Sequence, residues 1–148
     1  MRASAVLLPP MMSERSSGDC PGTRGQHWLV EYLGCDPKRL DDRQYLVSLL
    51  RRAAEAAGAK VVAEAIQPFS PHGMSAVLLI EESHFSLHTW PEAGYAAADF
   101  YTCGDCQPER AHAVLLAGVG AARSELMVIE RGLAGAGPSL AVGEARGD

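Results

Sequence analysis

The sequence has few cysteines and no long apolar run. Its four cysteines are unevenly spaced, so they do not resemble the disulfide framework that stabilises small secreted domains. The apolar run at residues 5–8 meets Pro9 at once and is too short for a signal-peptide core. No run approaches the roughly 20 residues of a membrane span. We therefore expect a soluble, cytoplasmic protein without a membrane segment.

Clustered positive charge is also missing. The chain has 13 Lys and Arg residues against 18 Asp and Glu residues, and its formal net charge is −5. Because nucleic acids and anionic membranes bind clustered cations, we expect neither as a partner. The 47% hydrophobic and 21% charged residues are typical of a globular protein, and 148 residues suffice for one domain with its own core.

The two ends of the chain differ in composition from its middle. Residues 1–25 mix Pro, Ser, Gly and isolated charges without a period, which predicts a disordered N-terminal extension. Residues 132–148 are rich in Gly and Ala and predict a flexible C-terminal tail. We expect the folded domain over residues 26–131.

Hydrophobic patterns within this domain alternate between helix and strand periods. Asp41 or Asp42 can cap a predicted amphipathic helix that ends at Gly58, and Pro108 begins a second helix that runs to about Gly118. The predicted extended segments are residues 27–33, 60–66, 75–82, 83–89, 96–103 and 124–131. Paired strands with two helices indicate an α+β fold, a two-layer sandwich in which a mainly antiparallel sheet carries both helices on one face.

Polar side chains are concentrated in residues 82–104. Because successive side chains of a strand point to opposite faces, Phe85, Leu87 and Phe100 can pack together beneath the helices. The uncovered face then carries His84, His88, Asp99, Tyr101 and Cys103. Such a polar sheet face is suited to a ligand or to a second subunit.

Two short motifs in this segment have alternative interpretations. His84 and His88 have the sequence spacing of a metal pair, but on a strand four residues span about 13 Å, so we expect no metal site there. Cys103 and Cys106 form a C-x-x-C motif, which leaves a thiol-based redox or binding role open. Structural roles are also open for Ser75, Phe69 and Trp90.

The same segment resembles the signature of the S-adenosylmethionine decarboxylase proenzymes of the short prokaryotic type. The matching pieces are Glu82-Ser83-His84, His88-Thr89-Trp90-Pro91-Glu92, Gly94-Tyr95-Ala96-Ala97 and Thr102-Cys103-Gly104. Upstream, the resemblance extends to Gly34-Cys35-Asp36 and to Phe69-Ser70-Pro71-His72-Gly73-Met74-Ser75. It covers about residues 27–131.

The resemblance implies a self-processing enzyme with a covalent pyruvoyl cofactor. In this family a serine hydroxyl attacks the preceding carbonyl, and β-elimination and hydrolysis then leave a pyruvoyl group and ammonia. The implied cleavage lies between Glu82 and Ser83. It yields a β chain of residues 1–82 and an α chain of residues 83–148 that begins with pyruvoyl. The ketone forms a Schiff base with the substrate amine and accepts electrons as carbon dioxide leaves.

The resemblance also implies a role for five other residues. His88 is the implied proton acceptor during processing, and Ser75 supports that step. Cys103 is the implied proton donor to the decarboxylated carbon. In substrate binding, Glu92 is expected to bind the ribose hydroxyls, and Phe69 to stack on the adenine or face the sulfonium.

The implied reaction converts S-adenosylmethionine to S-adenosylmethioninamine and carbon dioxide, which supplies aminopropyl groups for spermidine biosynthesis. The implied assembly is a homodimer of processed αβ protomers with active sites at the interface. Relatives of the family that act on L-arginine or L-ornithine leave these substrates as an alternative. A non-enzymatic thiol or binding module is a further alternative.

Overall fold

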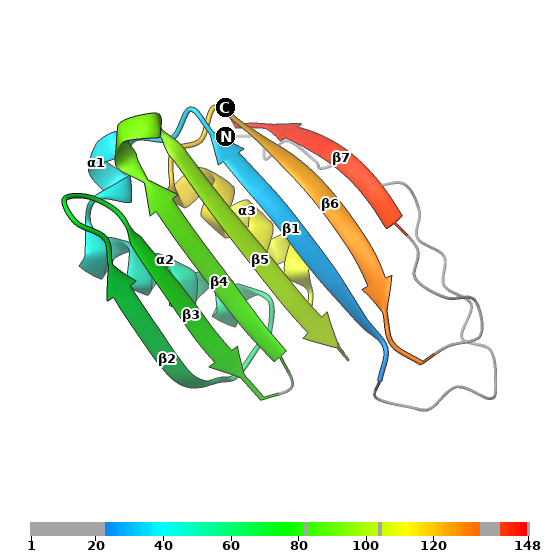
Figure 1. Ribbon diagram of the computed structural model, residues 1–148. Helices are drawn as coiled ribbons and strands as arrows, with labels where there is room; N and C mark the ends of the chain where they lie inside the picture. Colours follow the sequence, from blue (N-terminus) through cyan, green and yellow to red (C-terminus); the bar gives the residue numbers. More distant parts are fainter. Residues whose placement is uncertain (1–22, 82, 104, 134–139, 148) are drawn as a thin grey trace.

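A computed structural model describes residues 23–81, 83–103, 105–133 and 140–147. Its described strands form one seven-stranded sheet in the order β2-β3-β4-β5-β1-β6-β7, and every neighbouring pair is antiparallel (Figure 1). The strands are β1 (Gly25–Leu33), β2 (Val61–Pro68), β3 (Met74–Ile80), β4 (Ser83–Trp90), β5 (Tyr95–Cys103), β6 (Arg123–Arg131) and β7 (Leu140–Arg146).

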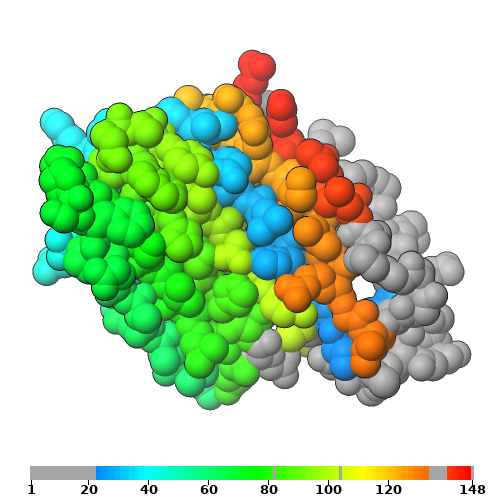
Figure 2. Space-filling view, viewed as in Figure 1, coloured from blue at the N-terminus to red at the C-terminus, as the bar shows by residue number. Residues whose placement is uncertain are grey.

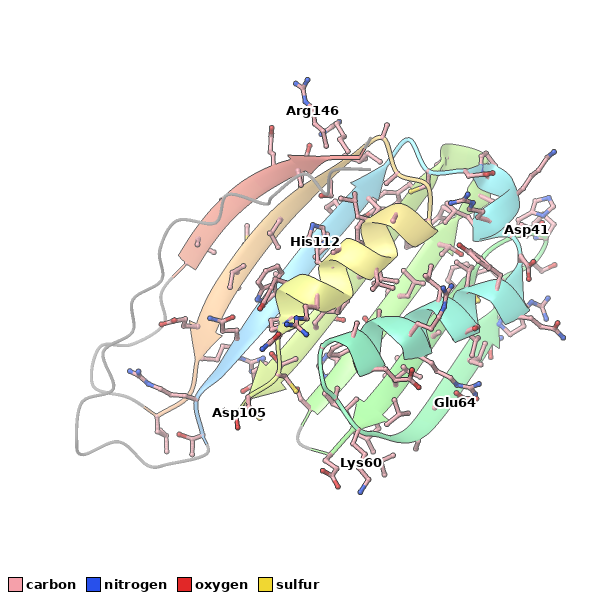
Figure 3. The ribbon with its side chains drawn as sticks, turned by 180° about the vertical axis from the view of Figure 1, so that it is seen from behind. Asp41, Lys60, Glu64, Asp105, His112 and Arg146 are labelled. Carbon is pink, nitrogen blue, oxygen red and sulfur yellow. The ribbon has the colours of Figure 1, made fainter. Side chains whose placement is uncertain are left out.

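Two long helices, α2 (Arg43–Ala56) and α3 (Pro108–Gly118), lie side by side on one face of the sheet (Figure 3). The Asp42 side chain accepts a hydrogen bond from the Tyr45 backbone N–H and so caps α2, while Pro108 opens α3. A short helix α1 (Pro37–Leu40) precedes α2, and a 3₁₀ turn η1 (Pro91–Ala93) joins β4 to β5. The predicted α+β sandwich with both long helices on one face is confirmed.

The core lies between this sheet face and the helices. Phe85, Leu87 and Phe100 are fully buried, as the alternation predicts, and the two phenyl rings contact each other with centroids 4.9 Å apart. Among the described residues, no helix covers the opposite face, which Figure 2 views from β2 in green to β7 in red. Within this part of the chain, one side of the sheet is therefore open.

The C-terminal segment differs from the expectation. A flexible tail over residues 132–148 is wrong for Leu140–Arg146, which form β7 and pair with β6 from Ile129 to Arg123. The open edge of β6 supplies backbone partners that compensate for the low strand propensity of a Gly- and Ala-rich segment. The predicted N-terminal extension lies outside the described residues, apart from residues 23–25, the last of which begins β1. Among the residues described, no helix has the length and apolar character needed to span a membrane.

Candidate active site

The uncovered sheet face carries the polar side chains that the alternation places there. His84, His88, Asp99, Tyr101 and Cys103 are all half-buried, while their strand neighbours Phe85, Leu87 and Phe100 are covered by the helices. The face is therefore accessible to a ligand or a partner without rearrangement of the core. The candidate site residues form three separate groups.

The first group joins Ser75 to His88. Ser75 on β3 lies directly opposite His88 on β4 in the strand register, and its Oγ is 2.6 Å from the imidazole Nδ1. This short contact holds one ring nitrogen, so the other, Nε2, is left to exchange a proton with a third group. The sequence-predicted pair of processing residues is thus in direct contact.

A cavity of about 480 Å³ lies at the β4–β5 turn, and its lining includes Phe69, Trp90 and Glu92. The Trp90 ring lies 6.4 Å from the His88 ring between centroids. The Phe69 and Trp90 rings are 5.9 Å apart between centroids, and Trp90 also stacks on Tyr95 at 5.2 Å. Two aromatic walls beside an exposed carboxylate suit a ligand with a flat ring and hydroxyl groups.

Gly73 allows the loop that carries Phe69 to approach the end of β4. Its φ is +89°, and a Cβ at this position would come within 2.2 Å of the Thr89 carbonyl oxygen and 3.1 Å of the Phe69 ring. The Phe69 backbone N–H donates to the Gly73 carbonyl oxygen at 2.9 Å and closes the loop. A glycine is therefore required here both by conformation and by space.

The second group lies at the other end of the sheet. Ser83 begins β4, and its buried Oγ has no hydrogen-bond partner among the described residues. Cys103 ends the neighbouring strand β5, where it is half-buried, and Cys106 lies in the loop that follows. The predicted cleavage-site residue Glu82 lies outside the described residues. An unpaired buried hydroxyl costs free energy, which makes Ser83 a reactive candidate rather than a structural one.

One chain does not bring these two groups together. Ser83 and His88 are five residues apart on the same strand, which corresponds to roughly 16 Å. Ser75 and Glu92 lie at the His88 end, whereas Cys103 lies at the Ser83 end. Side chains that the resemblance assigns to one reaction therefore occupy opposite ends of the sheet.

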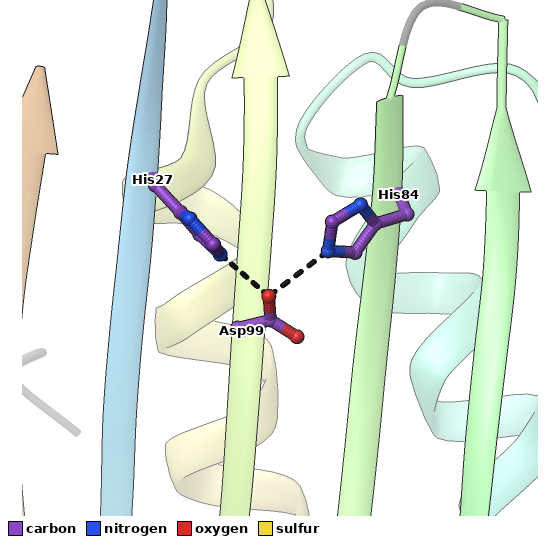
Figure 4. A group of neighbouring side chains, drawn as sticks. All are labelled: His27, His84 and Asp99. Atoms are coloured by element: carbon purple, nitrogen blue, oxygen red, sulfur yellow. Dashed lines mark hydrogen bonds and ion pairs between the residues drawn. The ribbon is translucent and has the colours of Figure 1, made fainter. Parts of the chain in front are cut away.

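The third group was missed by the sequence analysis. Asp99 Oδ2 lies 2.5 Å from His27 Nε2 and 2.9 Å from His84 Nε2 (Figure 4). In addition, Ser86 Oγ donates to the other carboxylate oxygen of Asp99. Burial alone would raise the pKa of Asp99, but the hydrogen bonds from Ser86, His27 and His84 outweigh it and hold the pKa below its usual value. Only the antiparallel pairing of β1 with β5 brings His27 to this position.

Comparisons with known proteins agree on one family. The family model of S-adenosylmethionine decarboxylase matches residues 26–132. A curated S-adenosylmethionine decarboxylase proenzyme of Parasynechococcus marenigrum is 48% identical over 92 residues, which is 62% of this chain and 72% of that protein. The corresponding proenzyme of Pyrococcus abyssi is 42% identical over 112 residues, 75% of this chain and 81% of its own length.

Solved structures add agreement in three dimensions. The adenosylmethionine decarboxylase of Aquifex aeolicus superposes with a TM-score of 0.67 at 32% identity, over 77% of this chain and 95% of the other. A Trypanosoma brucei AdoMetDC monomer, at 13% identity and a TM-score of 0.52, covers 74% of this chain and 47% of its own, and shares the fold. From the family match and these relatives, the chain belongs to the S-adenosylmethionine decarboxylase family.

Proposed function

We propose that this chain is a self-processing, pyruvoyl-dependent decarboxylase of S-adenosylmethionine. Its product, S-adenosylmethioninamine, would supply aminopropyl groups for spermidine biosynthesis. The observation that carries this proposal is the buried, unpartnered hydroxyl of Ser83, because it lies at the position where the family motif requires a cleavable serine. A cytoplasmic location stays a prediction.

Ser83 fits the role of cofactor precursor. Leaving a buried hydroxyl without a partner costs about 1–3 kcal/mol. Because the Ser83 Oγ has no hydrogen-bond partner among the described residues, it is available to attack the carbonyl of the preceding residue. The pyruvoyl group made from this serine supplies a ketone that binds the substrate amine and takes up electrons as carbon dioxide leaves. The chain's other residues then have to accept, donate and direct protons around that position.

His88 is the proposed proton acceptor during cleavage, and Ser75 is its positioning partner. With Nδ1 of His88 held 2.6 Å from the Ser75 hydroxyl, Nε2 is available to take the proton of the attacking hydroxyl. Cys103 is the proposed proton donor in the decarboxylation. Its position at the end of β5, on the strand next to the one that Ser83 begins, supports this role.

A homodimer would assemble the site. Since Ser83 and His88 of one chain are roughly 16 Å apart, we propose that the Ser83 end of one chain meets the His88 end of its partner. Two copies packed through their uncovered faces about a two-fold axis, with strands in opposite directions, satisfy this requirement. The same face exposes apolar side chains that such packing would bury: Val77, Leu79, Met127, Leu140 and Val142.

The cavity beside His88 favours a nucleoside substrate over a free amino acid. Phe69 and Trp90 provide aromatic surface for adenine, and Glu92 provides a carboxylate for the ribose hydroxyls. L-Arginine and L-ornithine have no ring to fill this space. Carbon dioxide release from the three labelled substrates decides between them, and release from arginine or ornithine alone would reject the proposed substrate.

Intact-mass spectrometry of the purified protein tests the cofactor directly. We expect fragments of residues 1–82 and 83–148, with an α-chain N-terminus that is blocked to Edman degradation. Ser83→Ala should remain a single chain of 148 residues, whereas Cys103→Ala should be cleaved but inactive. An uncleaved wild-type protein would reject self-processing. A redox or binding activity that is lost in Cys106→Ser but kept in Ser83→Ala would favour the alternative, a thiol-based module.

A further inference from the structure

We propose that His27, His84 and Asp99 form a binding site for one divalent transition-metal ion of the zinc type. The three residues come from the adjacent strands β1, β4 and β5, and all project onto the uncovered face (Figure 4). Their ligand atoms, two imidazole nitrogens and one carboxylate oxygen, all lie within 4.8 Å of one another. No role in the proposed decarboxylation has been given to any of the three.

The donor set selects the class of ion. Two imidazole nitrogens with one carboxylate oxygen suit Zn²⁺, Co²⁺ and Ni²⁺, whereas Mg²⁺ and Ca²⁺ prefer oxygen ligands throughout. Three protein ligands leave a fourth position for water. The scaffold is also suitable, because each ligand is fixed on the backbone of a paired strand, and Tyr101 lies opposite both His27 and His84 in the register.

Only a small movement converts the hydrogen-bonded cluster into a metal site. Ligands at about 2.0–2.1 Å from a tetrahedral ion are roughly 3.4 Å apart. The present distances from Asp99 Oδ2 to His27 Nε2 and His84 Nε2 are 2.5 and 2.9 Å. The carboxylate oxygen and the rings therefore need to separate by less than about 1 Å. The two imidazole nitrogens, which lie within 4.8 Å of each other, need to approach by no more than about 1.4 Å. Ser86 donates to Oδ1 of Asp99 and so leaves Oδ2 for the ion.

In the single chain, the cluster is accessible to an ion from solvent. The exposed fractions of the side chains are 18% for His27, 23% for Asp99 and 36% for His84. This exposure allows exchange with a metal buffer, while the partial burial strengthens attraction between the carboxylate and a divalent cation. In the proposed homodimer this face is covered, so the site would lie at or near the interface between the two copies.

Arg131 opposes metal binding in a way that can be tested. Its Nη1 lies 3.2 Å from His27 Nδ1, and a guanidinium can only donate, so Nδ1 is the acceptor. The neutral ring then carries its proton on Nε2, which is the proposed ligand atom. To bind the ion, His27 must move that proton to Nδ1 and break the contact with Arg131. Removing the guanidinium should therefore strengthen binding.

Calorimetric titration of the full-length chain with Zn²⁺, after dialysis against EDTA, measures the proposed site. We expect one ion per chain with a dissociation constant in the micromolar range or below, and visible absorption of the Co²⁺ form that indicates four or five ligands. His84→Gln and Asp99→Asn should each weaken binding by at least about 100-fold. Arg131→Gln should tighten it by about tenfold, the value of one lost hydrogen bond.

His72→Gln is the matched control, because His72 also pairs with a carboxylate, that of Asp41 at 3.3 Å, but lies outside the cluster. Its zinc affinity should equal that of the wild type, and circular dichroism should show that every variant is folded. No binding, or binding unchanged in His84→Gln and Asp99→Asn, would overturn the proposal. Loss of binding in Cys106→Ser alone would assign the ion to the thiols and overturn it equally. Uncleaved Ser83→Ala protein can be titrated in the same way, so the result does not depend on self-processing.

Discussion

The separation of Ser83 from His88 predicts that self-processing takes place between two chains. Five residues of strand span roughly 16 Å, whereas proton transfer needs heavy atoms within about 3 Å. Side-chain rotation cannot close a gap of this size while β4 remains paired with β3 and β5 from end to end. A dimer that joins the Ser83 end of one chain to the His88 end of the other removes the conflict.

A mixed dimer of two inactive variants tests this arrangement. Ser83→Ala and His88→Ala chains, carrying different affinity tags, would be co-expressed and purified through both tags in turn. In each mixed dimer one composite site has both native residues, and the other has neither. We therefore expect one chain in two to be cleaved, and mass spectrometry should identify it as the His88→Ala chain, since that chain keeps Ser83.

Each variant purified alone should stay intact, which provides the control. If the mixed dimer also stays intact while the wild-type dimer is cleaved, the two residues act within one chain and the geometric reasoning fails. Rapid cleavage of the His88→Ala protein on its own would instead show that His88 is not the proton acceptor.

Two further predictions concern stability, and both use Ser83→Ala protein so that each protomer unfolds as one uncleaved polypeptide. Gly73→Ala should lower the free energy of unfolding by more than about 2 kcal/mol, because strain at φ +89° is joined by contact with a carbonyl oxygen at 2.2 Å. Gly58→Ala is the control, because Gly58 has φ +79° and nothing lies within 4 Å of its Cβ, so this variant measures backbone strain alone. Equal losses of unfolding free energy in both variants would show that the contact with the carbonyl oxygen has no effect. His112 is buried against Tyr32, and burial lowers its pKa from 6.5 to about 4. Because the unfolded chain binds this proton first as the pH falls, stability present above pH 6.5 should decline toward pH 4, by about 2 kcal/mol between pH 7 and pH 5. Urea unfolding at the two pH values should show that this part of the loss disappears in His112→Gln, and an unchanged loss would contradict the assignment.

Local patterns were sufficient for most of the fold. The period of α2, its cap at Asp42 and the alternation around Phe85 and Phe100 depend on neighbours close in sequence, so they could be read directly. The strand β7 could not be predicted from local patterns, since its Gly- and Ala-rich sequence has little strand propensity of its own. It forms a strand because its backbone pairs with the edge of β6.

The sequence by itself determined the family motif, the serine proposed for cleavage and the polar face of the sheet. Tertiary structure decided which of those residues meet. Ser75 reaches His88 because β3 pairs with β4 in one register, and His27 reaches Asp99 across 72 positions because β1 pairs with β5. The same pairing keeps Ser83 at the far end of β4 from His88. Strand register depends on contacts between distant segments, and no local pattern in the chain contains that information.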